Sequence, residues 1–151
     1  MSIASKPLPK GYPRISSAVV YAEAGKAIDW LCKAFGFEIQ LKVEAGDGKI
    51  AHAELALGDG LIMTGDLDKK GRDWQKTPKQ AGGCTQALCV VVDDVDAHCE
   101  RARKAGATIA VEPKTSDYGD GYWVDRSYEA VDLEGHHWWF MQRLEDKRGA
   151  K

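Results

Sequence analysis

The chain has 151 residues, of which 44% are hydrophobic and 29% charged, and its formal net charge at pH 7 is −2. This length and composition are typical of one soluble globular domain. The sequence has no basic stripe and no apolar run near the ~20 residues of a membrane helix, so we expect neither a nucleic acid nor a membrane as partner. The first ten residues lack the apolar core of a secretory signal, which makes a cytoplasmic protein the default expectation.

The four cysteines show neither a CxxC pair nor zinc-finger spacing; they are Cys32, Cys84, Cys89 and Cys99. In a reducing compartment such cysteines are free thiols. We therefore expect no disulfide framework and no structural zinc site.

The first half of the chain predicts an extended arm followed by one βαβββ module. Residues 1–14 carry three prolines, which forbid a continuous helix and favour extended backbone. Strand and helix periodicities then predict a strand over residues 15–22, a helix over 25–36, and strands over 37–44, 49–57 and 61–66. Gly36 ends the predicted helix. These elements make a module over residues 15–66.

The second half begins after a polar, irregular segment, residues 67–85, which we interpret as a linker or lid. A strand is predicted over residues 87–93, and Asp94 is a good N-cap for a helix over 95–105. A short strand over 108–111, a loop over 113–121 and a final hairpin complete a second module over residues 86–143. Residues 144–151 form a polar tail.

The two halves repeat one another. Counting back 75 residues from Gly135, in the last hairpin, leads to Gly60, and the segment 52–64 has the same order of acidic, glycine and apolar positions. An offset of 70 aligns Gly106 with Gly36, the two predicted helix ends. The sequence therefore predicts an α+β fold of two tandem βαβββ modules, 15–143, whose curved mixed sheet surrounds a shared cleft.

Short motifs lie at fixed places in this repeat. Asp-Asp-Val-Asp, residues 93–96, follows the fifth strand, and Asp-x-Glu-Gly, residues 132–135, opens a run of the form Glu-Gly-His-x-Trp-x-Phe. In this order the chain resembles the vicinal oxygen chelate superfamily, which includes glyoxalase I, bleomycin- and fosfomycin-resistance proteins and extradiol dioxygenases. It is most similar to an uncharacterised, glyoxalase-like branch of that superfamily.

The resemblance implies four strand positions for a divalent metal, and they fall at or near Ser17, Thr64, Ala87 and Trp139. None is the imidazole, carboxylate or thiolate donor that such ions prefer. We therefore expect no metal and no other cofactor, and neither glyoxalase nor dioxygenase activity in its usual form.

Strand alternation predicts which side chains face the cleft. With a turn through residues 58–60, the cleft side of the first hairpin holds His52, Glu54, Ala56, Ile62 and Thr64, and its helix side holds Leu55, Leu57, Leu61 and Met63. The 75-residue offset places Ser127, Glu129, Val131, His137 and Trp139 on the cleft side of the second module. Tyr128, Trp138 and Phe140 then belong to the core, and His136 is expected to be exposed.

Four cleft residues, His52, Glu54, Glu129 and His137, are candidate catalytic groups. Half-buried carboxylates beside imidazoles act as general acids and bases, or ligate a metal in an unusual set. The alternative is a hydrogen-bonded polar floor with no catalytic role. Trp139 and Thr64 are candidate ligand contacts on the same side.

Further candidate ligand contacts lie in loops, where aromatic rings and a guanidinium could close over a planar or anionic molecule. They are Tyr122, Trp123 and Arg126, with Tyr118 beside them, and Trp74 in the linker. The alternative is that these residues pack a dimer interface, in which Tyr, Trp and Arg are also enriched.

Two functional hypotheses follow. The first is a metal-independent protein that binds a small aromatic or amphipathic molecule, as the resemblance to bleomycin-resistance proteins implies. The second is a glyoxalase-like lyase or isomerase that uses the cleft histidines and glutamates, with a noncanonical divalent metal as an option. In both cases we expect a homodimer, with the proline-bearing arm, residues 6–13, available to cross to the partner.

Overall fold

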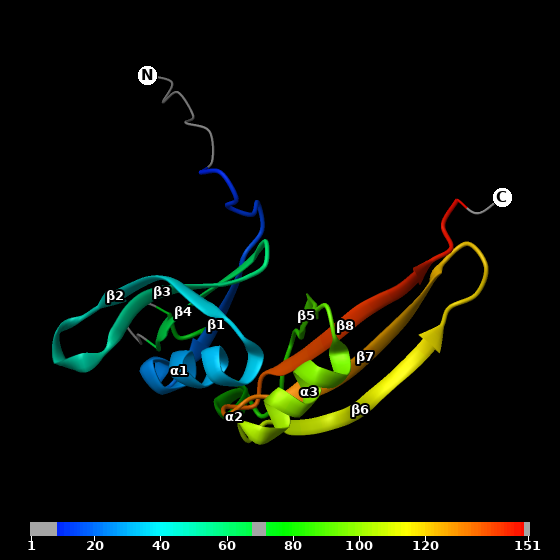
Figure 1. Ribbon diagram of the computed structural model, residues 1–151. Helices are drawn as coiled ribbons and strands as arrows, with labels where there is room; N and C mark the ends of the chain where they lie inside the picture. The colour runs from blue at the N-terminus through cyan, green and yellow to red at the C-terminus, as the bar shows by residue number, and fades with distance from the viewer. Residues whose placement is uncertain (1–8, 68–71, 150–151) are drawn as a thin grey trace.

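The computed structural model describes residues 9–67 and 72–149, which form two modules of the same topology (Figure 1). The first contains β1 (Ser17–Tyr21), α1 (Ala24–Phe35), β2 (Glu38–Glu44), a short 3-10 turn η1 (Gly46–Gly48), β3 (Ile50–Leu57) and β4 (Gly60–Asp66). The second contains β5 (Leu88–Val91), α3 (Val95–Lys104), β6 (Thr108–Asp117), β7 (Trp123–Val131) and β8 (His137–Asp146), and α2 (Pro78–Ala81) lies between the modules. The sheet orders β1-β4-β3-β2 and β5-β8-β7-β6 are equivalent, which confirms the predicted α+β fold of tandem βαβββ modules.

The core lies where α1 and α3 pack side by side against the sheets (Figure 1). Phe35 of α1 contacts Phe140 of β8, with ring centroids 4.7 Å apart. His98 of α3 joins the modules, because its Nε2 lies 2.9 Å from the carbonyl oxygen of Phe35 and its Nδ1 lies 2.7 Å from the Tyr128 hydroxyl. A carbonyl only accepts, so Nε2 carries the proton. Burial lowers the pKa of His98 and keeps the ring neutral.

The Asp-x-Glu-Gly turn between β7 and β8 fastens the second module to the first. The buried Asp132 carboxylate accepts hydrogen bonds from the Tyr21 hydroxyl at 2.7 Å and from Trp138 Nε1 at 3.1 Å. Glu134 accepts from the backbone N–H of Ala22 at 2.8 Å, just before α1. The motif that carried the family resemblance therefore has a structural role in this chain.

The register of the first hairpin corrects one prediction. Leu57 pairs with Gly60, so the turn has two residues, Gly58 and Asp59, where three were predicted. Every side chain of β4 consequently points to the side opposite to the predicted one. Ile62 and Thr64 are buried toward the helices, and Met63 lies on the open side next to Glu54.

The second hairpin has the predicted register, because its turn is one residue longer. Asp132 N–H bonds to the carbonyl of His136 at 3.0 Å, and Glu129 pairs with Trp139. The offset between the modules is thus 75 residues for β3 and β7 and 76 for β4 and β8. The true equivalent of Trp139 is Met63, and that of Thr64 is Phe140.

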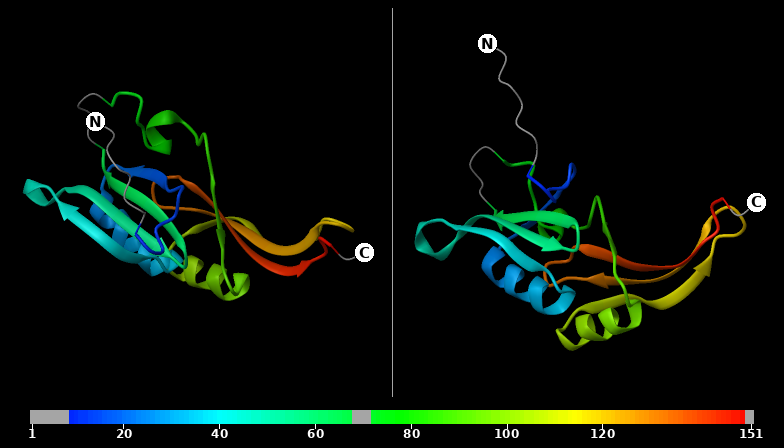
Figure 2. Two further views of the ribbon diagram at one scale, coloured as in Figure 1. Left: turned by 90° about the horizontal axis from the view of Figure 1, so that it is seen from above. Right: turned by 45° about the horizontal axis from the view of Figure 1, so that its top comes forward.

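Three predicted boundaries also differ. Strand β6 continues to Asp117 where a loop was predicted from Pro113, because Pro113 sits in a register shift that needs no ladder N–H. Strand β8 reaches Asp146, three residues into the predicted tail. Together with β7, these strands extend beyond the helices as a twisted ribbon (Figure 2). The predicted irregular linker contains α2. No helix within residues 9–67 and 72–149 is long and apolar enough to cross a membrane.

Candidate functional site

The side of each sheet that faces away from the helices is open, and two carboxylate–imidazole pairs lie on these open faces. On the first sheet, cross-strand pairing places together Ala18, Leu41, Val43, His52, Glu54 and Met63. On the second sheet it places together Cys89, Val91, Ser127, Glu129, Val131, His137, Trp139 and Met141. Apolar groups therefore lie around a glutamate–histidine pair on each face, Glu54 with His52 on the first and Glu129 with His137 on the second.

The pair on the first sheet is satisfied within the chain. His52 Nε2 lies 3.4 Å from Glu54 Oε1, and the Tyr12 hydroxyl donates to the same oxygen at 3.2 Å. Desolvation raises the pKa of the Tyr12 hydroxyl, and the neighbouring Glu54 carboxylate raises it further. The described part of the N-terminal arm, residues 9–14, thus lies on the sheet of its own chain; residues 1–8 are outside the described part.

The pair on the second sheet has an aromatic neighbour. His137 Nδ1 hydrogen-bonds Glu129 Oε1, and the Glu129 side chain is 15% exposed. Trp139 lies directly across from Glu129 in the β7–β8 ladder, and across from Cys89 in the β5–β8 ladder. We call Glu129, His137 and Trp139 the Trp139 cluster. It combines an indole ring face, a carboxylate that accepts hydrogen bonds and an imidazole on an apolar surface.

The four predicted catalytic residues do not meet in one site. His52 bonds Glu54 on the first sheet and His137 bonds Glu129 on the second. Within residues 9–67 and 72–149, no three His, Cys, Asp or Glu side chains gather closely enough to hold a metal ion. The single cluster of four predicted from the sequence is therefore replaced by two separate pairs.

The residues at the positions that the family resemblance assigns to a divalent metal do not fit such an ion. Thr64 faces the helices, and Met63 and Trp139 occupy the open side. A thioether and an indole are poor partners for the ions that take imidazole and carboxylate ligands. Thr64 is only 5% exposed and its Oγ1 has no hydrogen-bond partner among the described residues, so its side chain is not the contact on the open face that was predicted.

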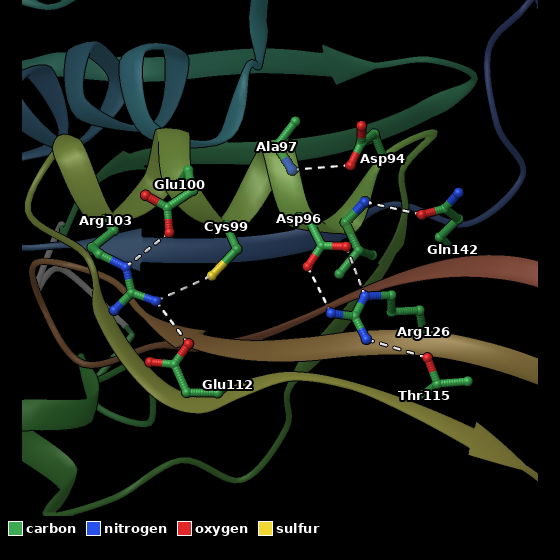
Figure 3. A network of polar contacts seen from close by, with 11 residues as sticks. Asp94, Asp96, Ala97, Cys99, Glu100, Arg103, Glu112, Thr115, Arg126 and Gln142 are labelled. Carbon is green, nitrogen blue, oxygen red and sulfur yellow. Dashed lines mark hydrogen bonds and ion pairs between the residues drawn. The ribbon is translucent and has the colours of Figure 1, made fainter.

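Arg126 is held on the helix side of the second sheet rather than at a ligand (Figure 3). Its guanidinium donates two hydrogen bonds of 2.7 Å to the Asp96 carboxylate of α3 and one of 3.2 Å to Thr115. The hydrogen bond from Arg126 lowers the pKa of Asp96. A bidentate pair of this kind leaves the guanidinium little capacity for another anion.

Tyr122 and Trp123 lie at the far end of the ribbon. The guanidinium of Arg143 lies 4.6 Å from the centre of the Trp123 ring, and Arg143 also pairs with Asp125. Trp123 and Glu129 are six positions apart along the extended strand β7, a distance of about 20 Å. The ribbon aromatics therefore do not join the Trp139 cluster within one chain.

Trp74 lies in the described part of the linker, at the edge of a cavity of about 350 Å³. The same cavity is lined by His136, whose Nε2 lies 2.8 Å from the carbonyl oxygen of Val20. His136 is therefore half-buried rather than exposed as predicted. A second cavity of about 160 Å³ adjoins the first and includes His52, Met63 and Arg72.

Sequence reasoning missed several residues around these cavities. Arg72, Lys76 and Cys84 lie in a segment without periodicity, so no pattern could show which way they face. Met63 could have been found from the length of the turn before it, since a two-residue turn reverses the faces of β4.

All four cysteines are free, as predicted.

Comparison with known proteins gives a consistent result. The model of the Glyoxalase/Bleomycin resistance protein/Dioxygenase superfamily matches residues 15–140. An uncharacterized protein of Mycobacterium bovis is 34% identical over 127 residues, which cover 83% of this chain and 80% of the relative. Among solved structures, TioX from Micromonospora sp. ML1 is 32% identical with a TM-score of 0.64, covering 86% of this chain and 95% of TioX.

A more distant structure shares the fold alone. TnmS3, described as an antibiotic binding protein from Streptomyces sp. CB03234, is 20% identical with a TM-score of 0.59. The alignment covers 87% of this chain and 99% of TnmS3. At this level of identity the two proteins share an architecture, and their ligands have to be argued separately.

Proposed function

Because the chain belongs to the glyoxalase/bleomycin resistance protein/dioxygenase superfamily, we propose that it binds a small aromatic or amphipathic molecule without a metal. The observation that carries the proposal is the Trp139 cluster. An indole stands on the open face of β8, at a position that the family resemblance assigns to a metal ligand, and beside it lies a hydrogen-bonded glutamate–histidine pair.

The chemistry of the cluster supports this ligand class. An indole face stacks on planar molecules and attracts cations. The side chain of Glu129 accepts hydrogen bonds, and His137 is 41% exposed and able to contact a ligand. Neighbouring Cys89 and Met141 supply apolar area. The fold itself is compatible with such a role, since TnmS3 is described as an antibiotic binding protein.

The test uses proflavine, a planar aromatic cation whose fluorescence reports binding, with protein dialysed against EDTA. We expect saturable binding that Trp139→Ala weakens by about 1–3 kcal/mol, or roughly five- to 150-fold in Kd, through the lost ring contact. Met63→Ala, at the equivalent position of the first sheet, is the control and should change Kd little. The proposal fails if wild-type protein does not bind, if Trp139→Ala binds equally well, or if EDTA abolishes binding and added metal restores it.

A second candidate function is supported by the carboxylate–imidazole pairs themselves. Glu54 and Glu129 are each 15% exposed and each contacts a histidine, an arrangement suited to moving a proton. Proton transfer α to a carbonyl, as in a glyoxalase-like lyase or isomerase, would use these pairs. Turnover of a 2-oxoaldehyde–thiol adduct that Glu129→Gln abolishes would favour catalysis over simple binding.

We also propose that the protein is a homodimer. Large apolar side chains are uncovered on both open faces, with Leu41 and Val43 each 43% exposed and Val91 67% exposed. Covering such side chains is favourable at about 25 cal/mol per Å². Light scattering should report about twice the 16.6 kDa chain mass, and Val91→Glu should shift the protein toward monomer because it buries a charge. A wild-type monomer at micromolar concentration would contradict the proposal.

A further inference from the structure

The segment 72–86 between the modules, which we call the linker segment, is internally ordered. Its helix α2 begins with a reciprocal cap, in which Gln80 N–H donates to Thr77 Oγ1 at 3.4 Å and Thr77 N–H donates to Gln80 Oε1 at 3.0 Å. Pro78 occupies the first helical turn, and Gly82 ends the helix with a positive φ of 75°. Each of these features specifies one local conformation.

Within α2 and after it, the linker segment is also tied to the body of the protein. Lys79 Nζ and Cys84 Sγ each donate to a backbone carbonyl of the β7–β8 turn at 3.1 Å. Gln86 Nε2 donates to the Ser17 hydroxyl of β1 at 2.8 Å. These contacts hold α2 and the residues that follow it beside the edge strand β1 (Figure 2).

A hollow remains between this fixed segment and β1. The cavity of about 350 Å³ and the adjoining cavity of about 160 Å³ share Ala18, Val19, Val20 and Gln75 in their walls, and we call the two together the linker groove. Leu88 adds a further apolar wall. The larger cavity alone is within the size range of small-molecule sites, roughly 300–1,000 Å³.

The charged groups in the walls of the linker groove are mainly positive. Arg72 lines the smaller cavity and Lys76 the larger one, and neither makes an ion pair with another described residue. Asp66 is the acidic wall residue, and its carboxylate already accepts from the backbone N–H groups of Ala24 at 2.9 Å and Ile50 at 2.6 Å. The groove therefore offers two cations to a ligand and no uncommitted carboxylate among its described walls.

An aromatic ring completes the groove. Trp74 lines the larger cavity and is 76% exposed. His136 also lines the larger cavity, and its Nε2 lies 2.8 Å from the carbonyl oxygen of Val20. A large exposed indole beside an apolar hollow is typical of a surface that receives a planar molecule.

We propose that the linker groove is a ligand site for a planar aromatic anion, whose ring stacks on Trp74 and whose acidic group is bound by Arg72 and Lys76. This site is separate from the Trp139 cluster, which presents a carboxylate to its ligand. The two proposals can therefore succeed or fail independently.

The test uses two fluorescent probes that share their ring system and differ in charge: 8-anilinonaphthalene-1-sulfonate and the uncharged N-phenyl-1-naphthylamine. We expect the double variant Arg72→Gln/Lys76→Gln to raise the Kd of the sulfonate roughly tenfold or more, since it removes both charge-assisted contacts. The Kd of the uncharged probe should change by less than about twofold. Trp74→Ala should weaken both probes.

Matched controls separate site binding from general effects. Lys104→Gln/Lys114→Gln removes the same charge from exposed positions elsewhere and should leave the sulfonate affinity unchanged. In a Cys89→Ser background, the bound sulfonate should slow modification of Cys84 by a thiol reagent, since Cys84 lines the groove. Three results would each overturn the proposal. The first is an equal loss of sulfonate affinity in the two double variants, and the second is a parallel loss of affinity for both probes in Arg72→Gln/Lys76→Gln. The third is a loss of sulfonate affinity in Trp139→Ala alone. The last result would leave the Trp139 proposal standing.

Discussion

Replacing Asp132 with alanine is expected to lower the free energy of unfolding by about 3–5 kcal/mol. The substitution removes the acceptor of the Tyr21 hydroxyl and of Trp138 Nε1. Tyr21 and Trp138 are both fully buried, so neither donor can turn to water. Burial and the nearby carboxylate raise the pKa of Tyr21, which keeps its hydroxyl protonated as a donor. Urea denaturation followed by circular dichroism measures the loss.

The first hairpin supplies the control for this experiment. Asp59 occupies the equivalent turn, but it is exposed, and we expect Asp59→Ala to change the free energy of unfolding by less than about 0.5 kcal/mol. Tyr21→Phe removes one donor and should cost about 1–2 kcal/mol. If Asp132→Ala were no more destabilising than Asp59→Ala, the turn would not be what fastens the modules to each other.

Sequence periodicity was sufficient to predict both βαβββ modules, because the apolar residues that recur with that periodicity form the core. Helical spacing places Ala27, Trp30, Leu31 and Ala34 on one face. The two alanines and Leu31 are fully buried, and Trp30 is half-buried. Turn length was harder to predict. Gly58-Asp59-Gly60 permits turns of two or three residues, and the choice reverses β4 while leaving β3 unchanged. The assumed three-residue turn placed Thr64 on the wrong face, whereas the faces assigned to β7 and β8 are correct because their turn is one residue longer.

The sequence predicted which face of its strand each residue of the candidate site occupies, but not which of these residues lie together. Alternation along β7 and β8 correctly placed Glu129, His137 and Trp139 on one face. The same alternation, counted back from Tyr128, would have placed Arg126 on the helix side, where Asp96 holds it. Whether the two sheets bring their histidines together depends on how the modules pack, which no local pattern encodes.

The linker groove shows a different limit of sequence reasoning. Its ordering depends on side chains that donate to backbone carbonyls of a turn about 50 residues away, as Lys79 does to Leu133. Backbone carbonyls are present at every residue, so the sequence has no mark for the one that is used. The cap formed by Thr77 and Gln80 is the exception, because Thr-Pro-x-Gln is a readable helix start.

Trp138→Ala is expected to destabilise the protein by about 3–5 kcal/mol, whereas the adjacent Trp139→Ala should cost less than about 1 kcal/mol. Trp138 is fully buried, and its ring centroid lies 5.4 Å from that of Phe35 and 5.7 Å from that of Phe37. Truncation would leave a cavity where rings of both modules meet, and Asp132 would lose a donor. Trp139 is half-buried on the open face, so truncating it creates no enclosed cavity.

Thermal and urea unfolding of the two alanine variants measure this difference in stability directly. The variant Trp138→Phe, which retains a ring, serves as an intermediate. We expect Trp138→Phe to fall between wild type and Trp138→Ala, because it fills part of the cavity but lacks the Nε1 donor. Equal losses of stability in Trp138→Ala and Trp139→Ala would mean that both indoles are core residues. The register of β8 would then be wrong, and since Glu129 and His137 are placed by pairing with the same strand, the Trp139 cluster would no longer be a binding face.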